Sequence, residues 1–236
     1  MNWQTRLFTL AATLSMIGLH QAWADLVAPR ADSGCTARNG DLFSPPTQSP
    51  QWAVDKDGVP IDLVQFYVHG PLLLLESLFV QQGWAEALPG NIPDDVVYGG
   101  SIVLGANWVV QRMPVSLESL CGKKMITAYE LDNDPLGGRR HFRIFSAGHD
   151  EQGRSVWALS ASRDTGLRFD PKRPGQFFIN HSSEADEDFE RDRVLQNLYR
   201  VDAVASLNTL VLAPTGYAAD NDAYSGDGRV YDIVIR

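Results

Sequence analysis

Residues 139–163 read RRHFRIFSAGHDEQGRSVWALSASR, and this stretch decides the fold. Charged and apolar side chains alternate over 139–147, which is typical of a half-buried strand. Residues 154–163 form a second strand pattern, and the turn residues Asp150 to Gly153 between the two favour a hairpin. We therefore expect an antiparallel sheet at the centre of the domain.

Helix and strand patterns continue on both sides of this hairpin. Pro71 suits the first turn of a helix over 71–82, which Gly83 ends. A second helix is expected over 101–112, and a third after Ser182 or Ser183, whose hydroxyl would cap it. Further strands are expected over residues 61–69, 119–130, 167–169, 177–180, 207–212 and 229–235. Together these elements predict a single α+β domain, a largely antiparallel mixed sheet with helices packed on it.

The first 24 residues have the features of a secretory signal peptide. A basic start precedes an apolar run over 7–19, and small residues at Ala22 and Ala24 predict cleavage after Ala24. The run is shorter than the ~20 residues of a membrane-spanning helix, so we expect a periplasmic or secreted protein with no membrane span in the mature chain. Residues 25–56, rich in Pro and Ser, are expected to form an extended arm before a domain over 57–236.

The charge balance of the chain bears on its partners. The 236 residues include 29 acidic and 20 basic side chains, which gives a net charge of -9. Because nucleic acids and anionic lipid surfaces are bound by basic surfaces, we expect no nucleic-acid partner and no polybasic docking on lipid. An envelope lipid bound in another way, or a membrane protein, stays a candidate partner.

The chain has two cysteines, Cys35 and Cys121, too few for a disulfide scaffold or a Cys-rich zinc site. In an oxidising compartment we expect one disulfide between them, which would tie the arm to the domain and contribute roughly 2–4 kcal/mol. The alternatives are a catalytic thiol at Cys121 beside a histidine, or two free thiols.

The most charged part of the chain is EADEDFERDR over 184–193, which follows His181. On one helix, Glu184, Asp188 and Arg191 share a side near His181. An imidazole beside two carboxylates is suited to binding a divalent metal or to acting as a general base. The alternative is a solvated helix face on which acids and bases form weak ion pairs.

The hairpin offers a second candidate site. Arg139, His141 and Arg143 lie two residues apart on one strand, so they share a face that could bind phosphate or carboxylate. Asp164, at the end of the next strand, either reaches the same face or caps a turn. The alternative for this face is a solvent-facing polar surface. The sequence contains no HExxH, phosphate-loop or GxSxG motif, so the metal and the cofactor stay unknown.

Four blocks in order resemble the C-terminal domain of LssY-type proteins, over roughly residues 57–200. The first three are 57–84, then Pro114-Val115-Ser116 with the later Gly122, and then the charged strand 139–143 with the strand that leads to Asp164. The most specific block runs through His181, Glu184, Asp188, Glu190, Arg191 and Asp192. Arg140 stands where the family pattern has a histidine, which weakens a two-His metal site on that strand.

The resemblance implies a fold and a set of site residues but no particular reaction. It implies that charged residues from the strands and the helix form one cluster, namely His141, Arg143, Asp164, His181, Asp188, Glu190 and Arg191. Domains of this family often follow membrane segments, including those of type-2 phosphatidic acid phosphatase proteins.

Three functions are compatible with these features. The first is a non-catalytic binding or accessory module of the cell envelope, in which Asp164, Glu184 and Arg191 belong to a buried ionic network. The second is a hydrolase acting on an envelope lipid or phosphoester, with catalytic roles for His181, Asp188 and Glu190. The third is an assembly partner of a membrane complex. A bidentate ion pair from Arg191 to Asp164 or Asp188 would favour the first over the second.

Overall fold

The computed structural model describes residues 41–48, 51–56, 58–89, 114–134, 138–169, 179–212, 215–219 and 222–236. The described helices are α2 (Leu72–Val80) and α4 (Glu187–Arg200). The described strands are β1 (Trp52–Val54), β2 (Pro60–Leu63), β3 (Phe66–His69), β4 (Ala85–Glu86), β5 (Leu88–Pro89), β6 (Pro114–Val115), β7 (Ser119–Leu120), β8 (Lys123–Lys124), β9 (Thr127–Asp134), β10 (Gly138–His149), β11 (Ser155–Phe169), β12 (Ile179–Ser183), β13 (Val204–Val211), β14 (Thr215–Ala219), β15 (Asp222–Gly226) and β16 (Arg229–Ile235).

The expected hairpin is the centre of an eight-stranded sheet. β10 and β11 pair antiparallel from Arg139 opposite Asp164 to His149 opposite Ser155. The strand order is β13-β16-β3-β11-β10-β9-β4, and β12 pairs with the far end of β11. Within this sheet β16 and β3 are parallel, and the other pairs are antiparallel. The chain is therefore an α+β protein in which strands outweigh helices, as the sequence predicts.

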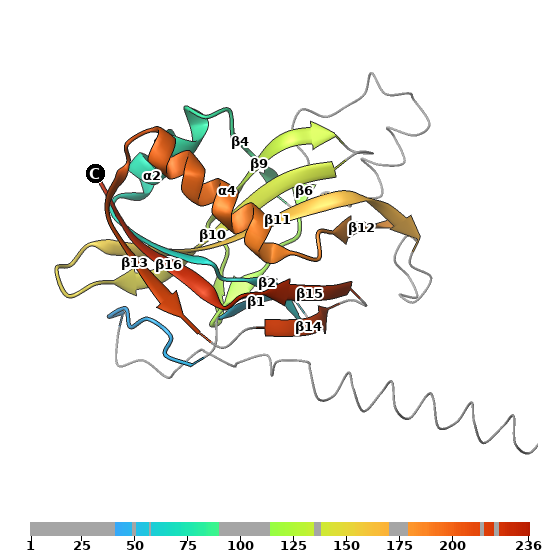
Figure 1. Cartoon of the computed structure of the whole chain (residues 1–236), viewed down its shortest axis with the longest axis horizontal. Coiled ribbons are helices and arrows are strands. Elements are labelled where there is room, and N and C mark those ends of the chain that lie inside the picture. The colour runs from blue at the N-terminus through green and yellow to red at the C-terminus, as the bar shows by residue number, and fades with distance from the viewer. Residues whose placement is uncertain are drawn as a thin grey trace, which may run out of the picture.

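The large sheet is covered on both faces. Helices α2 and α4 lie over one face, where Leu75, Phe79 and Leu198 pack against Phe142 and other strand residues; Figure 1 shows α4 crossing the strands on this side. A smaller sheet of order β2-β1-β7-β8 lies against the other face. Two hydrophobic cores result, one on each side of the large sheet.

Two expected strands are interrupted. The stretch 61–69 divides into β2 and β3, which belong to different sheets, and the chain changes sheet at Val64-Gln65. The sequence does not indicate this change of sheet, because both halves are rich in β-forming residues and both are buried strands. The stretch 119–130 divides into β7, β8 and β9 because Cys121 and Gly122 both have positive φ, at 50° and 75°. Two successive residues of this kind make the tight turn that closes a hairpin.

Helix α2 confirms the expected helix over 71–82. It begins after Pro71, and Gly83 follows it with a φ of +88°. The expected helix over 101–112 lies outside the described residues. No helix in the described part of the chain is long and apolar enough to span a bilayer.

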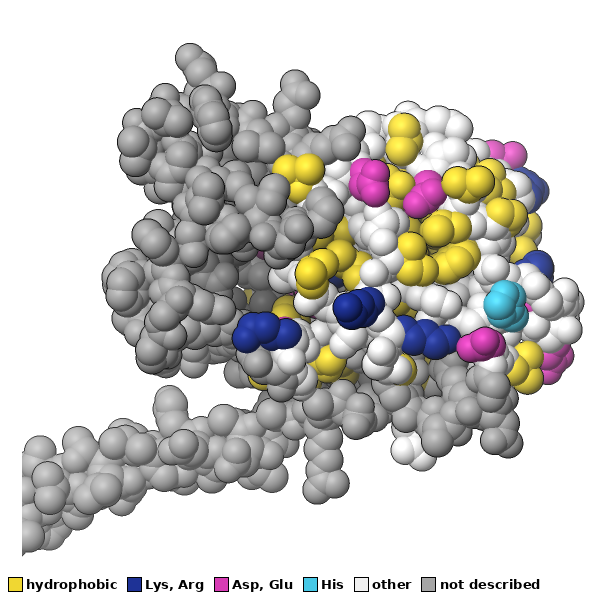
Figure 2. All heavy atoms as spheres, turned by 180° about the vertical axis from the view of Figure 1, so that it is seen from behind, with side chains coloured by type: hydrophobic (Ala, Val, Ile, Leu, Met, Phe, Trp, Pro, Cys, Tyr) yellow, Lys and Arg dark blue, Asp and Glu magenta, His cyan; other side chains and the backbone are white. Residues whose placement is uncertain are grey.

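The segment predicted as an irregular arm contributes to the fold. Residues Trp52–Val54 form β1, and Phe43 is buried in the core between the two sheets. The opposite side of the molecule from Figure 1 exposes hydrophobic side chains next to a row of Lys and Arg side chains (Figure 2). No one kind of side chain therefore dominates that face.

Candidate functional site

The charged face of β10 is buried, which corrects the expectation of a half-buried strand and contradicts the alternative of a solvent-facing polar surface. Arg139, His141 and Arg143 are each at most 6% exposed. Their neighbours on the strand, Phe142 and Ile144, point to the helix side and pack in the core there. The charged side chains therefore point toward the small sheet. A single strand's pattern shows alternation but does not show that a second sheet covers the polar face.

Arg143 lies at the centre of one group of polar side chains. Its Nη1 donates to the carboxylate of Asp62 on β2, and its Nε lies 2.9 Å from Oε1 of Glu118. Its Nη2 donates to the hydroxyl of Ser116 at 2.8 Å, and that hydroxyl donates to Glu118 at 3.1 Å. The guanidinium group is thus in contact with two carboxylates and a hydroxyl of its own chain.

Arg139 and His141 contact a second group of side chains on the same face. Nε of Arg139 donates to Asp164 at 3.0 Å, as their opposite positions on β10 and β11 allow. Nδ1 of His141 lies 3.7 Å from the same carboxylate, and its Nε2 shares a hydrogen bond with Ser162 at 2.9 Å. The structure therefore brings Arg139, His141 and Asp164 together, as the spacing suggested.

The carboxyl groups around Arg143 are buried and interact with one another. Burial raises the pKa of Glu118 to about 8, and Arg143 opposes this rise. Burial likewise raises the pKa of Asp62, which shares a hydrogen bond with Glu118, and that of Glu187. Burial thus favours the protonated form of these carboxyl groups, and the guanidinium of Arg143 opposes it.

The first turn of α4 is attached to the sheet by the side chain of Gln65. Its Oε1 accepts from the backbone N–H of Ala161, in the gap that β11 leaves between β3 and β12. Its Nε2 donates to the backbone oxygen and the carboxylate of Glu187, at 3.0 and 3.2 Å. The amide thus replaces a missing stretch of strand and holds the carboxyl of Glu187 in a buried position.

Helix α4 begins later than predicted. Its N-cap is Asp186, whose side chain accepts from the backbone N–H of Asp188, so neither Ser182 nor Ser183 caps it. Glu184 consequently precedes the helix and does not share a helical side with Asp188. Its backbone N–H donates to the oxygen of Arg163 at 2.7 Å. The carboxylate of Asp186 reaches the free N–H groups of the first turn, which is why it takes the capping position.

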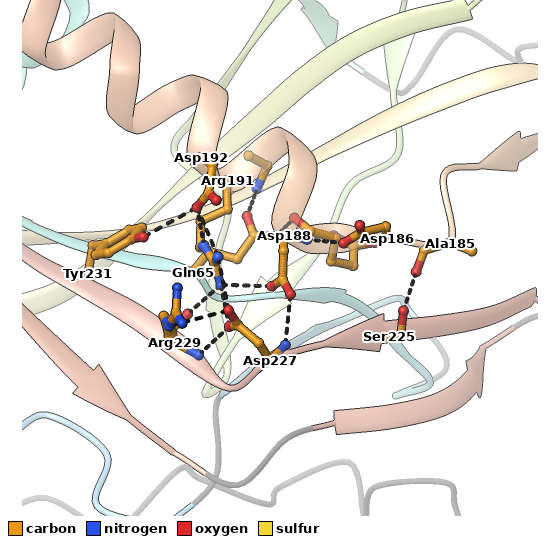
Figure 3. Close-up of polar contacts among 12 residues, drawn as sticks. Gln65, Ala185, Asp186, Asp188, Arg191, Asp192, Ser225, Asp227, Arg229 and Tyr231 are labelled. Atoms are coloured by element: carbon orange, nitrogen blue, oxygen red, sulfur yellow. Dashed lines mark hydrogen bonds and ion pairs between the residues drawn. The ribbon is translucent and has the colours of Figure 1, made fainter.

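Arg191 and Asp188 belong to a separate network between α4 and the turn before β16 (Figure 3). Arg191 is 1% exposed. Its Nη1 donates to Asp188 and to Asp227, at 2.7 Å each, and its Nη2 donates to the other oxygen of Asp227 at 3.4 Å. The bidentate partner of Arg191 is therefore Asp227, and Asp188 receives a single bond. The backbone N–H of Asp227 donates back to Asp188 at 2.8 Å, which closes the network.

The remaining predicted site residues lie elsewhere. Glu190, also on α4, is 3.5 Å from Nε of Arg140, on the helix side of β10. His181 lies on β12 opposite Leu167, and its side chain is outside the described part of the structure. The residues predicted as one cluster thus occupy three places: between the sheets, between α4 and β10, and between α4 and β16. Cys121 lies in the turn between β7 and β8; Cys35 is outside the described residues, so the disulfide stays a prediction.

A further group of interacting side chains, around His69, was not anticipated from the sequence. His69, the last residue of β3, lies 2.8 Å from Asp150 through Nδ1 and 2.7 Å from Asp232 through Nε2. Burial alone would lower the pKa of His69, but its hydrogen bonds to the two carboxylates raise it. The only sequence feature that could have indicated this group is a histidine at the end of an apolar strand. Neither Asp150 nor Asp232 is near it in sequence.

Several residues around Arg143 and Arg191 were also missed. Asp62 lies in a segment predicted as a strand, and Glu118 and Asp227 lie just before predicted strands, where nothing in the local sequence marks them. Within the described ranges, no three His, Cys, Asp or Glu side chains are arranged to hold a metal ion. Chemically, the described groups provide closed ion pairs and one pair of carboxyl groups that shares a proton.

Comparisons with known proteins give one match. The sequence model of the family described as LssY C-terminus matches residues 47–230, which is more than three quarters of the chain and begins within the segment predicted as an arm. No curated protein matches the chain. No solved structure matches it either.

Proposed function

Since the chain belongs to the LssY C-terminus family, we propose that it works as an exported, non-catalytic binding or accessory module of the cell envelope. One observation carries the proposal: Arg143 and Arg191 already form ion pairs with carboxyl groups of the same chain. Arg143 is held by Asp62 and Glu118, and Arg191 by Asp188 and Asp227.

Buried ion pairs within one chain favour a structural role for these arginines over ligand binding. A guanidinium that clamps a ligand must give up its present partners, and removing one partner of a buried ion pair costs about 3–5 kcal/mol. The same carboxylates join separate elements: Asp62 is on β2 and Glu118 precedes β7, whereas Arg143 is on β10. The ion pairs therefore hold the two sheets, and α4 against the large sheet, in fixed positions.

The exported location rests on the N-terminal sequence. The apolar run over 7–19 and the small residues Ala22 and Ala24 that follow it support removal of residues 1–24, and an oxidising compartment supports the disulfide between Cys35 and Cys121. Cell fractionation with intact-mass analysis tests both. We expect a chain that starts at Asp25 outside the cytoplasm and is lighter by two hydrogens than its reduced form. A cytoplasmic chain that retains Met1 would contradict the proposal.

One observation favours the alternative, a hydrolase acting on an envelope lipid or phosphoester. Asp62 and Glu118 share a hydrogen bond, and the pKa of Glu118 is raised to about 8 by burial. A protonated carboxyl beside a carboxylate is a combination that many hydrolases use as acid and base. The pair is buried, with Glu118 3% exposed, so a structural role fits it better.

Turnover measurements separate the two functions. The purified protein is incubated with phosphoesters, phospholipids and glycans, next to the variants Glu118→Gln and His181→Ala. We expect no turnover by any of the three. Turnover that either substitution abolishes, in a variant that still unfolds cooperatively, would replace the proposed module with an enzyme. Flotation with vesicles of phosphatidylethanolamine in the same preparation tests whether an envelope lipid is a direct ligand.

A further inference from the structure

Strand β13 is an open edge of the large sheet. It pairs with β16 on one side, and in the described part of the structure no strand lies on its other side. Six of its eight residues are exposed to solvent, and Val211 is 76% exposed. A strand in this position presents unpaired N–H and C=O groups to any second strand of matching length.

This edge lacks the features that usually prevent pairing. The sequence of β13, VASLNTLV, contains no charged residue, no proline and no glycine. The opposite edge of the same sheet differs, because it ends in β4, a strand of two residues that includes Glu86. Short edge strands and edge charges are common protections against edge-to-edge contact, and β13 has neither.

We propose that two copies of this chain associate by pairing β13 with β13 antiparallel across a two-fold axis. Such an axis runs perpendicular to the sheet, so both copies keep their helix-covered faces on the same side and form one continuous sheet. The residues near the axis meet their own counterparts. A charge there would repel itself, and Leu207, Asn208 and Thr209 are all uncharged.

The two ends of β13 carry no unbalanced charge. Asp202, which precedes the strand, forms an ion pair with Arg236 of its own chain. Arg229, which pairs with Val211 at the other end, forms an ion pair with Asp227. A chain with a net charge of -9 thus meets its copy along a neutral strand whose flanking charges are balanced within each copy.

Molar mass in solution and hydrogen exchange test the proposal on the full chain as its cell produces it. We expect a concentration-dependent dimer by light scattering, with slower amide exchange over 204–211 as the concentration rises. Asn208→Lys places two like charges at the axis and should weaken the dimer by at least roughly tenfold. Leu73→Lys, at an exposed position of α2, is the matched control and should leave the dimer unchanged.

Circular dichroism checks that each variant is folded. A wild-type protein that stays monomeric at its highest soluble concentration overturns the proposal. A dimer that Asn208→Lys leaves intact overturns it as well, because another surface must then form the contact.

Discussion

Replacing Glu118 by Gln should remove the pH dependence of stability that arises from this carboxyl group beside Arg143. In its protonated form, Glu118 accepts from Ser116 through Oε1, which also lies beside Nε of Arg143, and it shares a proton with Asp62. A glutamine reproduces this pattern, since its Oε1 accepts and its amide N–H donates. The variant therefore keeps the contacts of the protonated acid but has no proton to lose.

The size of the effect follows from the pKa of Glu118. Its ordinary pKa is 4.5, and burial raises it to about 8 in the folded protein. Between these values the folded chain holds a proton that the unfolded chain has released, so the free energy of unfolding falls as pH rises, by about 1.4 kcal/mol per pH unit. From pH 5 to pH 8 the wild type should lose about 3–4 kcal/mol through this group. The variant should not lose it.

Urea unfolding followed by tryptophan fluorescence at several pH values measures both proteins. At pH 5 we expect the wild type to equal or exceed the variant in stability, and at pH 8 we expect the variant to be the more stable. Glu151→Gln, in the exposed turn between β10 and β11, is the control and should follow the wild type. Parallel stability curves for wild type and Glu118→Gln over this range would refute the reasoning, because Glu118 would then not titrate there.

Three further substitutions test other parts of the fold. Because hydrogen bonds to Asp232 and Asp150 outweigh burial and raise the pKa of His69, its stabilisation is complete below the ordinary value of 6.5 and is lost as pH rises through the raised value. The stability difference between wild type and His69→Gln in urea should therefore shrink from pH 6 to pH 9. Arg191→Met removes the buried cation that joins α4 to the turn before β16 and leaves the partly exposed Asp188 and Asp227 without their partner, so the free energy of unfolding should fall by about 1–3 kcal/mol, which calorimetry can measure. Gly148→Ala places a Cβ against a backbone oxygen of the segment before β1, at a φ of +108°, so the melting temperature should fall, whereas the neighbouring Ala147→Gly should have a smaller effect.

Local sequence was sufficient for the secondary structure that depends on short-range pattern. The hairpin of β10 and β11, helix α2 and strand β16 all lie where periodicity and turn residues placed them. The misplaced boundaries depend on distant contacts. The attachment of the first turn of α4 depends on Gln65, which is 122 residues away from Glu187, and the break between β2 and β3 depends on a second sheet.

The candidate site was predictable only in part, for the same physical reason. Arg139 and Asp164 meet because the hairpin register places them opposite each other, and this register can be inferred from the sequence. A bidentate pair of Arg191 with Asp164 or Asp188 was the sequence-based criterion for a structural network, and Arg191 makes a single bond to Asp188 on the same helix. Its bidentate partner Asp227 comes from a turn 36 residues later, and a single sequence contains no signal for such a pair.

The position of β16 has a consequence for how the protein is made. Residues 229–235 form a strand inside the large sheet, between β13 and β3, and Tyr231 pairs with Phe66. The ribosome must therefore synthesise the chain through residue 235 before the large sheet can be completed. Until then β3 lacks one of its two neighbouring strands, and the sheet stays incomplete during synthesis. A protein with this topology is available in extended form to a translocation channel, and it completes its sheet on the far side of the membrane if it is exported.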